Sequence, residues 1–111
     1  MKIFDVKNMA VDAKFGEYIV GYEETGSHAC YLIYGILKPG EKDRLVKPGK
    51  GHEEILLAMQ GDLEVFGNYT GRLKEGYAIH IVGDNECILA NAGSKDAVYI
   101  ICGGHSAGGH H

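Results

Sequence analysis

The stretch P-G-K-G-H-E-E-I-L-L-A-M-Q-G, residues 48–61, decides the fold of this chain. A loop of proline and glycine leads into an unbroken apolar run, which predicts a strand whose side chains alternate between two faces. One face of that strand carries Lys50, His52, Glu54, Leu56 and Ala58. Polar side chains therefore meet the expected core where the strand begins.

Further strands are expected before and after this stretch. Together with residues 55–59, the expected strands cover residues 2–6, 17–21, 29–38, 63–66, 77–82, 86–90 and 97–102. Turns recur about every ten residues between them, which is typical of a β-sandwich or barrel. Gly61 and Asp62 predict a two-residue hairpin turn. If residues 91–96 close a second hairpin, Cys87 lies close to Ile101 or Cys102.

The length of 111 residues predicts one all-β domain, residues 1–102, followed by a flexible tail rich in glycine and histidine, residues 103–111. The strands at residues 31–37 and 55–59 are apolar on both faces. A surface strand should alternate, so we expect their outer faces to pack against a second subunit in a homodimer.

Net charge, the N-terminal sequence and the cysteine content indicate which partners and which cellular location to expect. The net charge of −4, with acids and bases interspersed, gives no basic stripe for nucleic acid and no cationic segment for a membrane. The first residues lack the apolar core of a signal peptide, so a cytoplasmic location is expected. The 3 cysteines are then expected to be reduced thiols.

The order of the elements resembles the cupin family, whose members are double-stranded β-helix barrels of the jelly-roll type. In the family's first motif, two histidines separated by one residue precede a glutamate, and a glycine follows after six more residues. Glu54 and Gly61 match the second half of that motif, and Gly76 and Asn91 match the ends of the second motif. The resemblance covers residues 29–102 and implies a small single-domain barrel with an internal pocket.

Three of the family's four metal ligands are replaced in this chain. Pro48 and Lys50 stand where the first motif has its histidines, and Cys87 stands where the second motif has its histidine. Only Glu54 remains. The metal motif is therefore degenerate, and the iron, manganese, zinc or nickel chemistry of the family does not carry over directly.

Two interpretations of the pocket remain open. In one, the Lys50 ammonium pairs with the Glu54 carboxylate in place of a metal, and the protein is a non-catalytic or regulatory module that binds a small polar or anionic ligand. In the other, His52 and Glu54 hold a zinc, nickel or iron ion together with Cys87 or His80, as in a metal-dependent isomerase or dioxygenase. An ammonium repels a metal ion, whereas a thiolate attracts one.

Other side chains are secondary candidates. Tyr31 and Tyr34 lie on opposite faces of one strand, and we assign Tyr34 to the ligand pocket. The face of His80 is undecided, so it is either a ligand or a partly exposed residue of an outer sheet. His105 follows Cys102 by three residues and forms a second soft metal site if Cys87 lies nearby. The tail histidines His105, His110 and His111 are also a weak capture site for nickel, zinc or copper.

Overall fold

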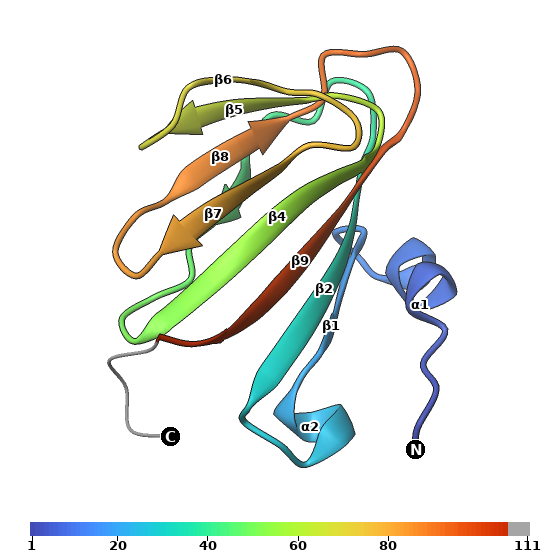
Figure 1. Ribbon diagram of the computed structural model, residues 1–111. Helices are drawn as coiled ribbons and strands as arrows, with labels where there is room; N and C mark the ends of the chain where they lie inside the picture. Colours follow the sequence, from blue (N-terminus) through green and yellow to red (C-terminus); the bar gives the residue numbers. More distant parts are fainter. Residues whose placement is uncertain (107–111) are drawn as a thin grey trace.

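A computed structural model describes residues 1–106 of the chain, which form two antiparallel sheets and two short helices (Figure 1). The helices are α1 (Val6–Asp12) and α2 (Tyr22–Thr25). The strands are β1 (Glu17–Val20), β2 (Cys30–Leu37), β3 (Arg44–Val46), β4 (His52–Gln60), β5 (Leu63–Gly67), β6 (Gly71–Leu73), β7 (Ala78–Val82), β8 (Cys87–Ala90) and β9 (Ala97–His105). One sheet has the order β1-β2-β9-β4-β7 and the other has the order β3-β8-β5-β6.

The core lies between the inner faces of the two sheets, and side chains from both sheets fill it. Its largest fully buried side chains are Tyr99, Leu37, Leu56, Leu63, Leu89, Ile101 and Val65. Burial of this apolar area is the main stabilising contribution to the fold. The alternation expected for β4 is confirmed, because Glu54, Leu56 and Ala58 are buried while Ile55 and Met59 are 52% and 50% exposed.

The N-terminal segment differs from the expectation. Residues 2–6 do not form a strand; instead α1 begins at Val6, and the Asp5 carboxylate accepts a hydrogen bond from the backbone N–H of Asn8 as an N-cap. Ala10 of this helix packs on the outer face of the larger sheet against Tyr34 and Val98. The apolar outer face of β2 is therefore covered by a helix of the same chain, where a second subunit was expected. Among residues 1–106, no helix has the length and apolar character needed to span a membrane.

Both expected hairpins are wrong. Strands β4 and β5 belong to different sheets, so the turn at Gly61, where φ is +76°, carries the chain from one sheet to the other. Strand β8 pairs with β3 and β5, whereas β9 lies between β2 and β4. Turn residues specify a change of direction but not the sheet that the next strand joins.

The far end of β9 corrects the expected tail boundary. The strand continues to His105, three residues beyond its expected end at Cys102, because Gly103 and Gly104 pair with both β2 and β4 and His105 pairs with β4. Cys102 is exposed on the outer face of the larger sheet and Cys87 is buried in the other sheet, so the soft metal site expected from these two thiols and His105 does not form. His110 and His111 lie outside the described residues.

Candidate functional site

Glu54 is the most unusual polar residue of the core. It lies at the start of β4 on the inner face, is only 5% exposed, and faces Gly103 of β9 and Ile81 of β7 in the strand register. The Tyr31 hydroxyl donates a hydrogen bond to its Oε2. Its Oε1 has no hydrogen-bond partner. Among residues 1–106 it is the one buried side-chain oxygen or nitrogen that lacks a partner. Such an atom needs an explanation, because buried polar groups are nearly always paired.

Tyr31 reaches Glu54 by crossing an intervening strand that has a glycine at the crossing point. In the register, Tyr31 of β2 lies opposite Gly103 of β9, and Gly103 lies opposite Glu54 of β4. A Cβ atom at Gly103 would stand 2.1 Å from Tyr31 Cζ, far inside van der Waals contact. The absence of a side chain at position 103 therefore makes this contact possible. We call these three residues the Tyr31 bridge.

The interior environment favours protonated forms of its acids. Burial raises the pKa of Glu54, and repulsion from Glu17 adds to this, while the hydrogen bond from Tyr31 and the nearby His52 act in the opposite direction. Burial and the hydrogen bond to Glu54 raise the pKa of Tyr31. Burial and the negative charge of Glu54 raise the pKa of the Cys87 thiol, so it is a poor nucleophile at neutral pH.

Two histidines lie where β4 begins and β9 ends, two residues from Glu54 and Gly103 along each strand. His52 and His105 face each other in the pairing of β4 with β9, and their ring centroids are 5.1 Å apart. The Tyr31 ring lies 6.3 Å from that of His52. The Ser106 N–H donates to the Gly51 carbonyl oxygen at 2.9 Å, which ties the end of β9 to the loop before β4. Both strand ends meet at this end of the molecule (Figure 1).

A second bridge of the same construction lies further along the same two strands. The Tyr99 ring of β9 lies over Gly35 of β2, where an added Cβ would stand 2.0 Å from Tyr99 Cζ. The Tyr99 hydroxyl donates to Glu17 of β1 at 2.5 Å. We call these residues the Tyr99 bridge. The two bridges are related by the local two-fold symmetry of the antiparallel pair, about the facing residues Ile33 and Ile101.

The Tyr99 bridge has a cation that the Tyr31 bridge lacks. Arg44 of β3 donates from Nη1 to the Tyr99 hydroxyl oxygen at 2.6 Å, and the same nitrogen is 3.8 Å from Glu17. Its Nη2 donates to the carbonyl oxygen of Phe15 at 2.5 Å. All three members of this cluster are therefore satisfied.

Two of the residues assigned to the pocket lie elsewhere. Lys50 is exposed in the turn before β4, and among residues 1–106 no ion pair joins it to Glu54. Tyr34 is on the outer face of the larger sheet, buried against α1. The tyrosine that enters the barrel is Tyr31. The prediction for Tyr34 is wrong because α1 covers the face of β2 on which this side chain lies.

The three remaining candidates separate into inside and outside positions. His52 lies on the inner side at the start of β4, and its Nδ1 is 3.3 Å from the Lys50 carbonyl oxygen. Cys87 is 3% exposed and packs in the core. His80 lies on the outer face, where its Nε2 is 2.7 Å from Glu53 Oε1. His80 therefore does not face the same space as Glu54.

The donor set does not fit the metal ion that the resemblance to the cupin family implies. Position 48 offers proline, and Lys50 is exposed and cationic. Within residues 1–106 there is no group of three or more histidine, cysteine, aspartate or glutamate side chains that could hold a metal ion. A zinc or iron site needs at least three such donors converging on one point. We therefore derive no chemistry through a metal.

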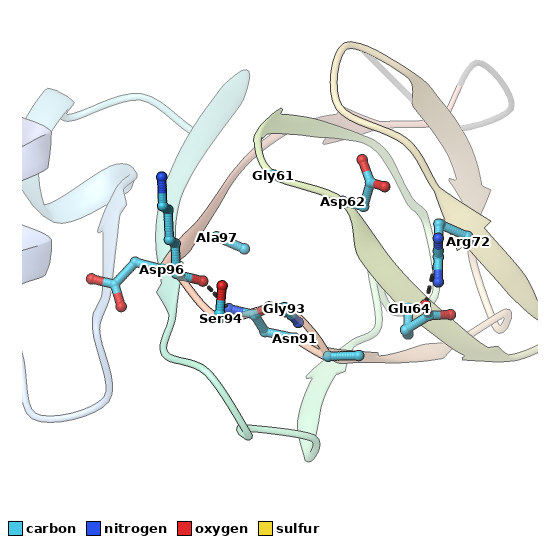
Figure 2. Close-up of a pocket in the computed structure, with 11 residues that line it drawn as sticks. Gly61, Asp62, Glu64, Arg72, Asn91, Gly93, Ser94, Asp96 and Ala97 are labelled. Carbon is cyan, nitrogen blue, oxygen red and sulfur yellow. Dashed lines mark hydrogen bonds and ion pairs between the residues drawn. The ribbon is translucent and has the colours of Figure 1, made fainter.

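Five cavities on residues 1–106 have linings that contain neither Glu54 nor Tyr31. A cavity of about 310 Å³ lies at the opposite end of the barrel, between the turn at Gly61 and the loop of residues 91–97 (Figure 2). Its buried amide, Asn91, already donates to two carbonyl oxygens, and Arg72 is paired with Glu64. A smaller cavity, of about 130 Å³, lies beside β7 and β8 and is lined by Ile81 and Cys87.

A repeated pattern in the sequence could have revealed Tyr31 and Gly103. The segment Y-L-I-Y-G at residues 31–35 matches Y-I-I-C-G at residues 99–103. When two such strands pair antiparallel with their centres aligned, each tyrosine faces the other strand's glycine. The pattern predicts both bridges once β2 and β9 are known to be neighbours.

Comparisons with known proteins identify the fold. No family model matches the chain, and no curated protein matches its sequence. Solved structures do match. They include the Schizosaccharomyces pombe Cnp3 cupin domain (18% identity, TM-score 0.66, 81% of this chain and 60% of that one) and a predicted oxalate decarboxylase from Thermotoga maritima (18%, 0.67, 81% of each chain). A cupin protein from Bacteroides fragilis is also similar (14%, 0.69, 89% of this chain and 84% of that one).

These likenesses establish a cupin fold and leave the function open. The identities are low, and this chain spans only 60% of the Cnp3 domain's length. The similar proteins include one described as a decarboxylase and others described only as cupins. A shared fold supports many activities, so function has to be argued from the site.

Proposed function

We propose that this chain, which has the cupin fold, is a small-molecule binding module whose ligand contacts Glu54 and Tyr31. The observation that carries the proposal is the Glu54 Oε1 atom, which is buried and lacks a hydrogen-bond partner. Leaving such a group unpaired costs about 1–3 kcal/mol, and more when it is charged. A ligand that supplies the missing donor recovers this cost, which would otherwise only weaken the fold.

The small cavity beside β7 and β8 is not lined by Glu54 itself but by residues next to it. Two of its lining residues, Ile81 and Cys87, are core neighbours of Glu54: Ile81 faces it in the strand register, and the Glu54 charge acts on the Cys87 thiol. Its volume of about 130 Å³ is well below the roughly 300–1,000 Å³ typical of sites for drug-sized ligands. The proposed ligand is accordingly a molecule of only a few heavy atoms.

The test is a thermal denaturation screen of the full chain with small amines, polyols and carboxylic acids at millimolar concentration. A ligand that binds the folded state raises the melting temperature. We expect at least one compound to raise it in the wild type and not in Glu54→Gln. The matched control is Glu53→Gln, which changes the same chemical group on the outer face of the same strand. Compounds that stabilise both variants equally would refute the role of Glu54.

The alternative, a metal-dependent isomerase or dioxygenase, is less well supported. Its proposed ligands point to different spaces, because His80 lies outside the barrel with Glu53 while Cys87 lies inside. Elemental analysis of protein purified without a nickel column tests this. About one metal ion per chain, retained after truncation at Ser106 and lost in Glu54→Gln, would favour the enzyme over the binding module.

We further propose that the module is a homodimer in which two copies join through the uncovered outer face of β4 and β7. This face exposes Ile55, Met59 and Val82 at 52%, 50% and 43%. Its charged pair, Glu53 with His80, is already formed within each chain. A second copy of the same face therefore meets it with these two polar side chains already hydrogen-bonded and with its apolar side chains facing the same apolar patch, as a self-complementary two-fold interface requires.

Light scattering at micromolar concentration tests the dimer. We expect twice the mass of one chain for the wild type and the mass of one chain for Ile55→Glu. The control is Ile88→Glu, because Ile88 is 40% exposed on the other sheet. A wild-type protein with the mass of one chain would contradict the proposal.

A further inference from the structure

The Tyr99 bridge shows which chemical group completes an arrangement of this kind. There, the tyrosine hydroxyl donates to a glutamate and also accepts a hydrogen bond from Arg44, whose guanidinium lies 3.8 Å from the same carboxylate. The tyrosine oxygen and the carboxylate together make an acceptor pair. A planar cation with several N–H donors suits such a pair, because it can donate to both at once.

The Tyr31 bridge presents the same pair of acceptors without the cation. The Tyr31 hydroxyl donates to Glu54 Oε2, so its oxygen lone pairs remain available to accept. Glu54 Oε1 has no partner. Within residues 1–106 no lysine or arginine forms an ion pair with Glu54.

We infer that the ligand of the Tyr31 bridge is a small organic cation with N–H donors, an alkylammonium or alkylguanidinium, which takes the place that Arg44 has in the Tyr99 bridge. This inference rests on the proposed function and adds the chemical class of the ligand. It replaces the small anion expected from Lys50, because that ammonium is exposed and unpaired with Glu54. An anion at this position would face the Glu54 carboxylate directly.

The surrounding charges agree with a cation. Glu17 repels the Glu54 carboxylate and the nearby His52 acts in the opposite direction, but among residues 1–106 Glu54 lacks the paired arginine charge that Arg44 gives to Glu17. A bound ammonium or guanidinium supplies it. In a low-dielectric interior, a charged hydrogen-bonding partner is worth more than the same contact in water.

The experiment is a titration of the ¹⁵N-labelled full chain at pH 8, in which the amide chemical shifts are measured by NMR after each addition of the probe. The probes are methylguanidinium and methylammonium, with tetramethylammonium as a cation without N–H donors and acetate as an anion. We expect saturable shifts at Glu54, Gly103 and Ile81 with the first two probes only. Removal of a charged hydrogen bond costs about 1.5–3 kcal/mol, so affinity should fall roughly 10- to 150-fold in Glu54→Gln.

Three variants separate the possible outcomes. Tyr31→Phe keeps the carboxylate and should weaken binding by less than Glu54→Gln, and Glu53→Gln should leave it unchanged. Equal binding of tetramethylammonium, or no saturable shift with either N–H cation, would overturn the inference. Binding of acetate that depends on Glu54 would overturn the cation class and leave the proposed function standing. Cation binding that is unchanged in Glu54→Gln would overturn both.

Discussion

The two tyrosine bridges have the same construction and differ in one group. Each has a tyrosine that lies over a glycine of the neighbouring strand and donates to a glutamate one strand further on. The Tyr99 bridge is completed by Arg44, whose side chain is 12% exposed. The Tyr31 bridge has no such partner, and one oxygen of its glutamate remains unpaired. Since the backbone geometry is shared, the difference lies in chemistry alone.

This difference separates a structural element from a candidate binding site. A fully satisfied buried network stabilises and rigidifies its surroundings, whereas an incomplete one carries an energetic cost. Tyr99 is fully buried, and the Tyr99 bridge ties β1 and β3 to the central strands. The Tyr31 ring of the other bridge lies 6.3 Å from that of His52, at the start of β4. The incomplete network is the one for which we propose a ligand.

Adding a methyl group at the two glycines should have the largest effect. Gly35→Ala and Gly103→Ala each place a Cβ inside a tyrosine ring, and overpacking typically costs about 1–3 kcal/mol. We expect Gly35→Ala to cost more, because Tyr99 is 0% exposed while Tyr31 is only half-buried and can move outward. Urea unfolding measures both. The control is Gly21→Ala, where the nearest contact is an ordinary 3.6 Å; equal losses in all three variants would contradict the steric argument.

Removal of the cation should make the Tyr99 bridge resemble the Tyr31 bridge. Arg44→Met removes the donor to Tyr99 and the positive charge near Glu17, and we expect a loss of about 1.5–3 kcal/mol in the free energy of unfolding. Arg72→Met is the matched control, since the Arg72 side chain is 59% exposed in its pair with Glu64 and such pairs contribute at most about 1 kcal/mol. Similar losses in both variants would show that the two bridges do not differ in the way described.

The unpaired carboxylate should make stability depend on pH. Because the pKa of Glu54 is raised in the folded state, its stabilising effect is fully present below the unfolded-state pKa and is lost as pH rises through the folded-state pKa. The groups that act on it are Tyr31, Glu17 and His52, and it acts in turn on Cys87.

We therefore expect Glu54→Gln to be more stable than the wild type at pH 8, by about 1 kcal/mol, with no ligand present. The advantage should shrink as the pH falls below the folded-state pKa of Glu54, where the wild-type carboxyl is neutral as well. Thermal unfolding at a series of pH values measures this. An advantage that does not change with pH would mean that the charge of Glu54 is not its cause.

Substitution of Tyr34, the tyrosine that the sequence predicts to line the pocket, should have the smallest effect on stability and binding. Tyr34→Phe removes a hydroxyl from the cluster under α1, on the outer side of the sheet. We expect a change within about 0.5 kcal/mol in stability and none in ligand binding. Tyr31→Phe, compared in the same calorimetric and titration experiments, should change both. A binding defect in Tyr34→Phe would return that residue to the site.

The fold could be predicted from the sequence because its main signal is local. The alternation from His52 to Ala58 correctly placed Glu54 inside, and the spacing of turns correctly indicated a barrel of antiparallel strands. The partners of each strand could not be predicted in the same way. Gly61 marks a turn equally well whether the next strand pairs with β4 or crosses to the other sheet.

The site was harder to predict because its deciding contacts are between distant residues. Tyr31 and Tyr34 lie in a strand that is apolar on both faces, so alternation alone cannot say which one faces inward. The answer depends on α1, which covers the face of Tyr34. Likewise, the hydrogen-bond partner of Glu54 is Tyr31 of β2, which reaches it across β9. Among the residues close to Glu54 in the sequence, the partner predicted for its carboxylate was Lys50. The glycine at position 103 has meaning only in that register.

The position of β9 also has a consequence for how the protein folds during synthesis. This strand lies between β2 and β4 and supplies one residue to each bridge, Tyr99 and Gly103. Until residues 97–105 have left the ribosome, β2 and β4 have open edges and no shared neighbour. The nascent chain then exposes two apolar strands for the time needed to make the last strand, when edge-to-edge association is most favourable. Assembly of the larger sheet therefore waits for β9 and is governed by contacts between residues far apart in sequence.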